Sequence, residues 1–405
     1  MDAVPDKPPA DERASSPRHP EPLRIAPRLS TKLDVTMLFA VCAVVVWHAS
    51  NLNSRFLSGH YRARPPDPPA AVTAVEWLIS GALTHWSIPL FFALSGFLFA
   101  KDLLPTVRSF ADKWRVRVRT LLLPFLLWSA LGVALFALEG SVSLPARLTS
   151  PDVARRLEHF DVLDAWLRYP VTYPLWFLQA LLLCVLVSPV LYLLVDRLGY
   201  LGLAPLVALW VLTRRGHGHY YDALALTFFA LGMIVALRLR TGRWVPCCGE
   251  RGPGRRLALV LPPLYITACI AYGLTLRGSR DWWALVLFQV ITCFGVAAVW
   301  FGYDVYLRRW EAARVVTLLT PLAFFIFVAQ EPALHWFKRL FLVLTGGTET
   351  GAGAVLVAYA LTPVATLAAV ALLGMALRAT LPSVYGVLTG GRGMKRDAQP
   401  TSAPR

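Results

Sequence analysis

Residues 33–50 read LDVTMLFAVCAVVVWHAS, an apolar run with one carboxylate near its start and one histidine near its end. A helix of about 20 mostly apolar residues is long enough to cross a bilayer. Nine further mostly apolar runs follow, at about 77–100, 120–138, 174–195, 198–213, 221–237, 257–276, 283–303, 315–331 and 352–377. The sequence therefore predicts an all-α, polytopic membrane helix bundle with about ten transmembrane helices.

The composition supports this fold class. Of the 405 residues, 56% are hydrophobic and only 16% are charged, whereas about 25% of residues are charged in water-soluble proteins. The formal net charge is +16. Because the arginines lie in loops between apolar runs and form no basic helix face, the charge indicates loops that face anionic membrane lipid rather than nucleic-acid binding.

The positive charges also predict an orientation. With ten spans, 27 of the 40 Lys and Arg residues fall on the side of the N-terminus, and cytoplasmic loops carry this excess. We therefore expect a multi-pass protein of the bacterial cell membrane with both termini in the cytoplasm. The polar ends, residues 1–30 and 381–405, are expected to be disordered cytoplasmic tails around a membrane domain at 31–380.

Two histidines are candidate functional groups at the expected outer side. His48 ends the first run and His85 stands inside the second, so a hairpin would bring both to the same depth. Ionisable side chains within a span are costly and mark functional sites by default. Two structural interpretations stay open: His48 as an interfacial histidine bonded to a neighbouring helix, and His85 with Trp86 as part of an aromatic belt.

Further polar and aromatic residues are expected near these histidines. Trp176 begins the fourth run, and Gln330 and Glu331 end the ninth. Indole rings stack well on apolar CH faces, so Trp86 and Trp176 are candidates for the walls of a substrate site. Together with His85 and Gln330, they form the predicted substrate-binding set.

A basic segment precedes the third run at the expected cytoplasmic side. It contains four cations in seven residues: Lys113, Arg115, Arg117 and Arg119. Such side chains can hold phosphate groups through charge-assisted hydrogen bonds. They can equally serve only as an orientation signal, and the pattern itself leaves both interpretations open.

No metal site is expected. Cys247 and Cys248 are adjacent and lack the spacing of a zinc site. The other four cysteines lie in apolar runs, where a thiol behaves as a small hydrophobe.

Several segments, in this order, resemble a known family. They are Leu33-Asp34 followed by His48, IPLFFALSGF at 88–97, RVRTLLLPF at 117–125, LWFL at 175–178 and, more weakly, FFIFVAQEP at 324–332. On these motifs the chain resembles the bacterial integral-membrane acyltransferases called acyltransferase 3, which modify sugars and other envelope or secreted molecules. The resemblance covers about residues 30–380.

The resemblance implies an O-acyltransferase that uses acyl-CoA, with acetyl-CoA as one candidate, and a hydroxyl of a sugar, envelope glycan or other metabolite as acceptor. His48 would be essential for transfer, and the basic segment would bind the donor. Whether His48 acts as general base or as nucleophile stays open. Asp34 or Glu331 is expected to orient a histidine, although Asp34 also fits a helix N-cap.

The chain departs from the family at three places. Many members carry Arg or Lys where this chain has Met37, and many carry His where it has Gln330. The arginines of the basic segment alternate rather than follow the common Arg-x-x-Arg form. A transporter or exporter of a lipid or polysaccharide is the competing function, but we find no two-fold internal repeat of the kind common in transporters.

Overall fold

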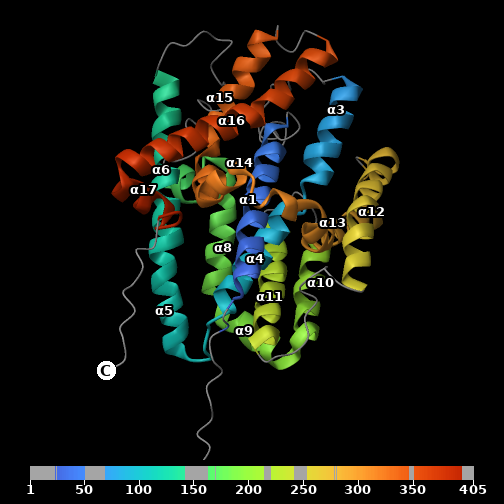
Figure 1. The fold of residues 1–405 in the computed structure, drawn as a ribbon, viewed down its shortest axis with the longest axis vertical. Helices are drawn as coiled ribbons and strands as arrows, with labels where there is room; N and C mark the ends of the chain where they lie inside the picture. Colours follow the sequence, from blue (N-terminus) through green and yellow to red (C-terminus); the bar gives the residue numbers. More distant parts are fainter. Residues whose placement is uncertain are drawn as a thin grey trace, which may run out of the picture.

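The computed structural model describes residues 23, 25–50, 69–141, 163–168, 170–213, 220–240, 253–277, 279, 281–345 and 351–394. Every regular element in these ranges is helical, so the predicted all-α fold is confirmed. Nine helices in the same ranges are long and apolar enough to cross a membrane. The chain is a multi-pass membrane helix bundle (Figure 1).

The longer helices are α1 (Pro27–Ala49), α4 (Ser87–Ala100), α5 (Val107–Arg117), α6 (Leu123–Ser141), α8 (Trp176–Leu186), α9 (Ser188–Leu198), α10 (Ala204–Leu212), α11 (Tyr220–Arg240), α12 (Pro253–Thr275), α13 (Trp282–Gly302), α15 (Ala323–Leu344) and α16 (Ala352–Thr380). Shorter helices are α3 (Ala70–Glu76), α14 (Arg314–Leu319) and α17 (Pro382–Thr389). Single π or 3-10 turns link neighbours, such as η1 (Trp77–Leu83) between α3 and α4 and η2 (Val118–Leu122) between α5 and α6.

One expected span, 174–195, is wrong as a single helix. The backbone leaves the α conformation at Val187 (φ −85°, ψ 4°), between α8 and α9. Pro189 stands in the first turn of α9, where proline begins a helix but cannot continue the preceding one. The described ranges therefore hold nine helices long enough to cross a membrane, and Tyr173–Leu186 is a shorter apolar helix beside them.

Helices α4 and α11 pack with their backbones in contact. A Cβ atom on Gly96 would lie 2.0 Å from the carbonyl oxygen of Phe229, and one on Gly232 would lie 1.9 Å from that of Ala93. Small residues permit this approach between helices in a membrane. The α4–α11 pair forms a rigid wall beside α1.

Helix α1 lies in the middle of the bundle (Figure 1) and packs against α4, α15 and α16. Near its start, the buried Lys32 donates from Nζ to Oδ2 of Asp304 at 2.7 Å. Directly after its end, the carbonyl oxygen of Ser50 accepts a hydrogen bond from Nζ of Lys338 at 2.8 Å. A hydrogen bond from a lysine therefore anchors each end of α1. These two bonds fix how deep the side chains of α1 lie in the bundle.

Helix α15 bends at Glu331, whose backbone is extended (φ −92°, ψ 136°). The next residue is Pro332, and the residue before a proline is sterically driven out of the α conformation. The candidate span Arg314–Glu331 ends at this bend, and the remainder of α15 continues in a new direction to Leu344.

Helices extend past the inner boundaries of both expected tails. Helix α1 begins at Pro27, four residues inside the expected N-terminal tail. Pro382 starts α17, and the buried Tyr385 stacks on Phe325 with ring centroids 5.5 Å apart, so the chain to residue 394 is folded. Apolar contacts therefore extend past the last predicted span. Residues 1–22 and 395–405 lie outside the described ranges.

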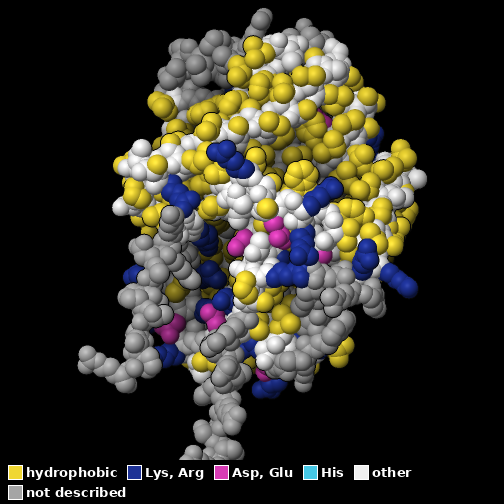
Figure 2. Space-filling view, viewed as in Figure 1, with side chains coloured by type: hydrophobic (Ala, Val, Ile, Leu, Met, Phe, Trp, Pro, Cys, Tyr) yellow, Lys and Arg dark blue, Asp and Glu magenta, His cyan; other side chains and the backbone are white. Residues whose placement is uncertain are grey.

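The surface shows the polarity of a membrane protein. In the view of Figure 2, hydrophobic side chains cover the upper part of the molecule. Most of the visible Lys, Arg, Asp and Glu side chains lie in its middle and lower part, where α1 and α5 begin. On this face, the described residues of the two ends of the bundle thus differ in charge.

Candidate active site

The four cations of the basic segment point in two directions. Residues two apart on a helix differ by about 200° in direction, so Lys113 and Arg117 share one face and Arg115 and Arg119 share the opposite one. Arg115 is exposed and pairs with Asp112 at 3.3 Å. Arg119 is also exposed. Two of the four predicted donor-binding cations therefore face away from the bundle.

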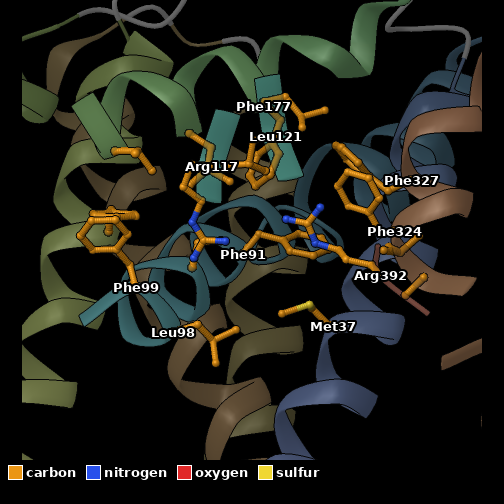
Figure 3. A pocket seen from close by; sticks show the side chains of 17 residues that line it. Met37, Phe91, Leu98, Phe99, Arg117, Leu121, Phe177, Phe324, Phe327 and Arg392 are labelled. Carbon is orange, nitrogen blue, oxygen red and sulfur yellow. The ribbon is translucent and has the colours of Figure 1, made fainter. Parts of the chain in front are cut away.

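Only Arg117 of these cations lines a cavity. Lys113 donates from Nζ to Asp102, the acid that also acts electrostatically on Arg117, and lies 5.9 Å from the ring of Phe99. The guanidinium of Arg117 makes no hydrogen bond to another described residue and extends into the cavity (Figure 3). The basic segment thus supplies one charge to an internal site.

The cavity has a volume of about 150 Å³ and an apolar wall built by residues of α1, α4, α8, α11 and α15. Its aromatic side chains are Phe91, Phe99, Phe177, Phe229, Phe324 and Phe327. Two guanidinium groups, those of Arg117 and Arg392, are directed toward each other across it, with Met37 below them in the view of Figure 3. No described residue of the wall is Asp or Glu. The cavity therefore suits an anionic group that carries an apolar chain.

Arg392 comes from the turn that follows α17. Its Nη1 donates to the carbonyl oxygens of Thr120 (2.5 Å) and Thr389 (3.1 Å), and its guanidinium lies 4.2 Å from the centre of the Phe324 ring. Burial and the neighbouring Arg117 lower the pKa of Arg392 to about 10. Arg392 was not predicted as a site residue because it lies in the segment expected to be disordered.

His48 lies inside the bundle at the other end of α1, with 6% of its surface exposed. Its ring meets that of Tyr173 edge-on at 5.3 Å and lies 4.9 Å from that of Trp47. The buried His85 meets Trp47 at 5.9 Å and Phe288 at 4.9 Å. The two histidines thus share Trp47 as a neighbour, and neither ring faces lipid.

A buried polar network adjoins His48. Oγ of Ser50 donates to Oε2 of Glu76 at 3.4 Å, and the carbonyl of Ser50 accepts from Lys338. Lys338 also interacts electrostatically with Glu76, Glu331 and His48. Neither Glu76 nor Lys338 was predicted as a site residue. Glu76 lies one residue before an expected span, and Lys338 lies in a stretch that belongs to no expected span. The signal available in the sequence was a charged residue that flanks an apolar run.

The two carboxylates that were candidates to orient a histidine lie at different ends of the bundle. Asp34 is exposed in the third turn of α1, fourteen residues or about 21 Å from His48 along the helix. The N-cap of α1 is Ala26, so the N-cap interpretation of Asp34 is wrong. Glu331 stands at the bend of α15 and shares the polar network of Lys338. Glu331 is therefore the carboxylate on the His48 side.

The four predicted substrate-binding residues lie outside the cavity wall. Trp86 packs against two hydrophobic clusters, and Trp176 meets Tyr221 with ring centroids 4.6 Å apart. Gln330 is fully buried and donates from Nε2 to the carbonyl of Phe327 at 2.9 Å. Its Oε1 has no hydrogen-bond partner in the described part of the chain, which leaves a buried acceptor available to a bound hydroxyl.

Four chain segments connect the cavity with the end at which His48 lies. In each segment, one residue lies in the cavity wall and a second residue lies one or two turns closer to the His48 end. The pairs are Val41 and His48, Phe91 and His85, Phe177 and Tyr173, and Phe327 and Gln330. The rings of Phe91, Phe177 and Phe327 contact one another with centroids 5.3 to 6.0 Å apart. We call these three residues the aromatic constriction, because they lie in the cavity wall where three of these segments run on toward the His48 end.

Metal ligands do not gather in the described ranges, where no group of three His, Cys, Asp or Glu residues could hold an ion. Cys247 and Cys248 lie outside those ranges.

Comparison with known proteins agrees with this architecture. No solved structure shows a significant match. The chain is similar to the succinoglycan biosynthesis protein ExoH of Rhizobium meliloti (strain 1021), with 26% identity over 339 residues that cover 80% of this chain and 85% of ExoH. Residues 31–374 match the acyltransferase 3 family, described as an acyltransferase domain. This match runs from α1 to α16, and the chain therefore belongs to the acyltransferase 3 family and is a membrane acyltransferase.

Proposed function

We propose that this protein transfers an acyl group, with acetyl as the first candidate, from acyl-CoA to a hydroxyl of a sugar or glycan. The cavity at Arg117 binds the donor, and His48 acts on the acceptor. One observation carries this assignment: the arginine-bearing cavity and His48 lie along the same four chain segments, with the aromatic constriction in the cavity wall where three of these segments run toward the His48 end.

The donor fits the chemistry of the cavity. Phosphate groups form strong charge-assisted hydrogen bonds with guanidinium groups, and an acyl-pantetheine chain is compatible with walls of Phe and Leu. Val41, in the cavity wall, is seven residues from His48, a rise of about 10 Å on α1. An extended thioester arm that passes the aromatic constriction therefore has a short distance to cover.

His48 supplies the proton transfer. Neutral imidazole is the side chain best able to accept a proton from a hydroxyl near neutral pH. As His48 takes this proton, the hydroxyl oxygen attacks the thioester carbonyl carbon, the new C–O bond forms and the C–S bond breaks. CoA leaves as its thiol, with the proton returned from His48. A nucleophilic route through an acyl-imidazole uses the same residue and is distinguished by trapping acylated protein without acceptor.

The acceptor is assigned to the His48 end. Trp86, Trp176 and His85 supply rings there, and the buried Oε1 of Gln330 can accept a hydrogen bond from a sugar hydroxyl. The similarity to a protein named for succinoglycan biosynthesis favours a glycan as acceptor. The excess of Lys and Arg on the N-terminal side favours cytoplasmic termini in the bacterial cell membrane, with donor from the cytoplasm and acceptor from the opposite leaflet.

The test is a comparison of cells with and without the gene. Mass spectrometry of envelope glycans and extracted metabolites should show an acylated product only when the protein is present. Purified protein should release free thiol from acetyl-CoA, and the release should depend on the extracted acceptor. Transport of the same glycan across vesicles without any gain in acyl mass would overturn the proposal in favour of an exporter.

A further inference from the structure

The two arginines in the cavity differ from ordinary surface cations. Arg117 and Arg392 face each other within an apolar wall that holds no described acidic residue (Figure 3). Buried charges are normally paired with an opposite charge. Among the described residues, the hydrogen bonds of Arg392 go to two backbone carbonyls, both through Nη1, so its other nitrogens remain available to a ligand within this part of the structure.

The fold delivers Arg392 to this place by a defined turn. Gly390, Gly391 and Gly393 all have positive φ (60°, 79° and 74°), which side chains rarely adopt. A Cβ on Gly390 would lie 2.6 Å from Cα of Thr120, and one on Gly393 would lie 2.1 Å from the carbonyl oxygen of Pro321. The turn is therefore packed against Thr120 and Pro321, which lie within two candidate spans, and its position is fixed.

We propose that Arg392 is a second donor-binding residue, and that it and Arg117 clamp one phosphate or pyrophosphate group between them. The C-terminal turn thus completes the donor site. This identification of the anion as part of CoA rests on the proposed function. Two guanidinium groups that repel each other when the cavity is empty gain most from a shared anion, because each can donate two parallel hydrogen bonds to it.

The position of Met37 agrees with this assignment. Met37 lies in the same cavity wall, below both guanidinium groups in Figure 3. It brings no charge, so the cations that the described wall offers to an anion are Arg117 from the segment before the third predicted run and Arg392 from the C-terminal turn.

The experiment measures binding of CoA and of inorganic pyrophosphate to the full-length protein in detergent by calorimetry. Arg392→Gln should weaken CoA binding about tenfold or more, since a charge-assisted hydrogen bond is lost. Arg117→Gln should do the same, and the double variant should lose less than the product of the single losses, because both residues bind one group. The exposed Arg309→Gln, with the same loss of charge, should leave binding unchanged.

The outcomes separate this inference from the proposed function. CoA binding equal to wild type in a folded Arg392→Gln protein overturns the inference and leaves the function standing. Arg392-dependent binding of pyrophosphate without any binding of CoA keeps the clamp and overturns the donor. Binding of neither probe by the wild type overturns both. Should Arg392→Gln not fold, Arg392→Lys keeps the charge and should weaken CoA binding at least threefold through loss of the paired hydrogen bonds; equal affinity overturns the inference.

Discussion

The two ends of α1 place their charged groups in different surroundings. At the arginine end, an open cavity of about 150 Å³ holds two cations in an apolar wall. At the His48 end, His48 and Glu76 are buried and Lys338 and Glu331 are partly buried, and Lys338 interacts with Ser50, Glu76 and Glu331 together. The arginine end can bind an added anion, whereas the charged groups of the His48 end interact with one another. Substitutions at the first should therefore change donor binding, and those at the second should change turnover or folding.

The sharpest test of this difference is His48→Ala. Loss of a general base typically lowers the rate by about 10²- to 10⁴-fold. We expect a fall of this size in the turnover number for acyl transfer to extracted acceptor, with the donor KM nearly unchanged. His85→Ala is the matched control, because His85 is equally buried and shares Trp47 as a neighbour; we expect less than a tenfold loss. Equal losses in the two variants would contradict a catalytic role specific to His48.

Lys338→Met tests whether the His48 end depends on its internal charges. Removing one partner from a buried ionic network typically costs about 3–5 kcal/mol, because the remaining charges lose their compensation. We expect a clear drop in the thermal unfolding temperature in detergent. Lys113→Met removes a lysine whose ion pair with Asp102 is partly exposed, so its cost should be about 1 kcal/mol or less. A larger effect at Lys113 would reverse the comparison between the two ends.

The basic segment shows how far the sequence predicts this site. Its four cations were visible in the sequence, and helical periodicity alone divides them into the Lys113–Arg117 pair and the opposite face. That Arg117 has space beside it depends on five other helices, and no local pattern contains this information. Arg392 was hidden for the same reason, because its neighbours Thr120 and Phe324 are remote in sequence.

The fold shows a similar division. The hydrophobic runs predicted the helical class and most spans, because a bilayer imposes one length on every crossing. The break at Val187 lies two residues before Pro189 and the bend at Glu331 lies one residue before Pro332, so the sequence contained their local cause. The folded segment at 382–394 was not predictable, because its stability comes from Tyr385 on Phe325 and from glycines packed on two distant spans.

Arg117→Gln and Arg119→Gln compare two arginines that differ in direction and little else. Arg117 enters the cavity, whereas Arg119 is exposed on the opposite face. We expect Arg117→Gln to raise the KM for acyl-CoA by about 10- to 100-fold with little change in acceptor KM. Arg119→Gln retains the cavity and loses only a screened surface charge, so about a twofold change is expected. Equal shifts in both variants would mean that the segment acts only through its total charge.

The smallest expected effect tests the boundary between the two ends. Phe327 belongs to the aromatic constriction, and Gln330 follows it one turn further along α15. Phe327 lines the cavity with an entirely apolar side chain. Phe327→Leu should widen the passage toward His48, because a leucine leaves space where the ring met Phe91 and Phe177. We expect a change of a few-fold in the relative rates with acetyl-, butyryl- and hexanoyl-CoA, in favour of the longer chains, and an unchanged affinity for CoA itself.

Phe99→Leu is the matched control, because Phe99 lines the same cavity away from the constriction and meets Phe229 instead. If both variants shift chain-length preference alike, the acyl chain lies in the cavity as a whole, and the constriction does not separate donor binding from transfer.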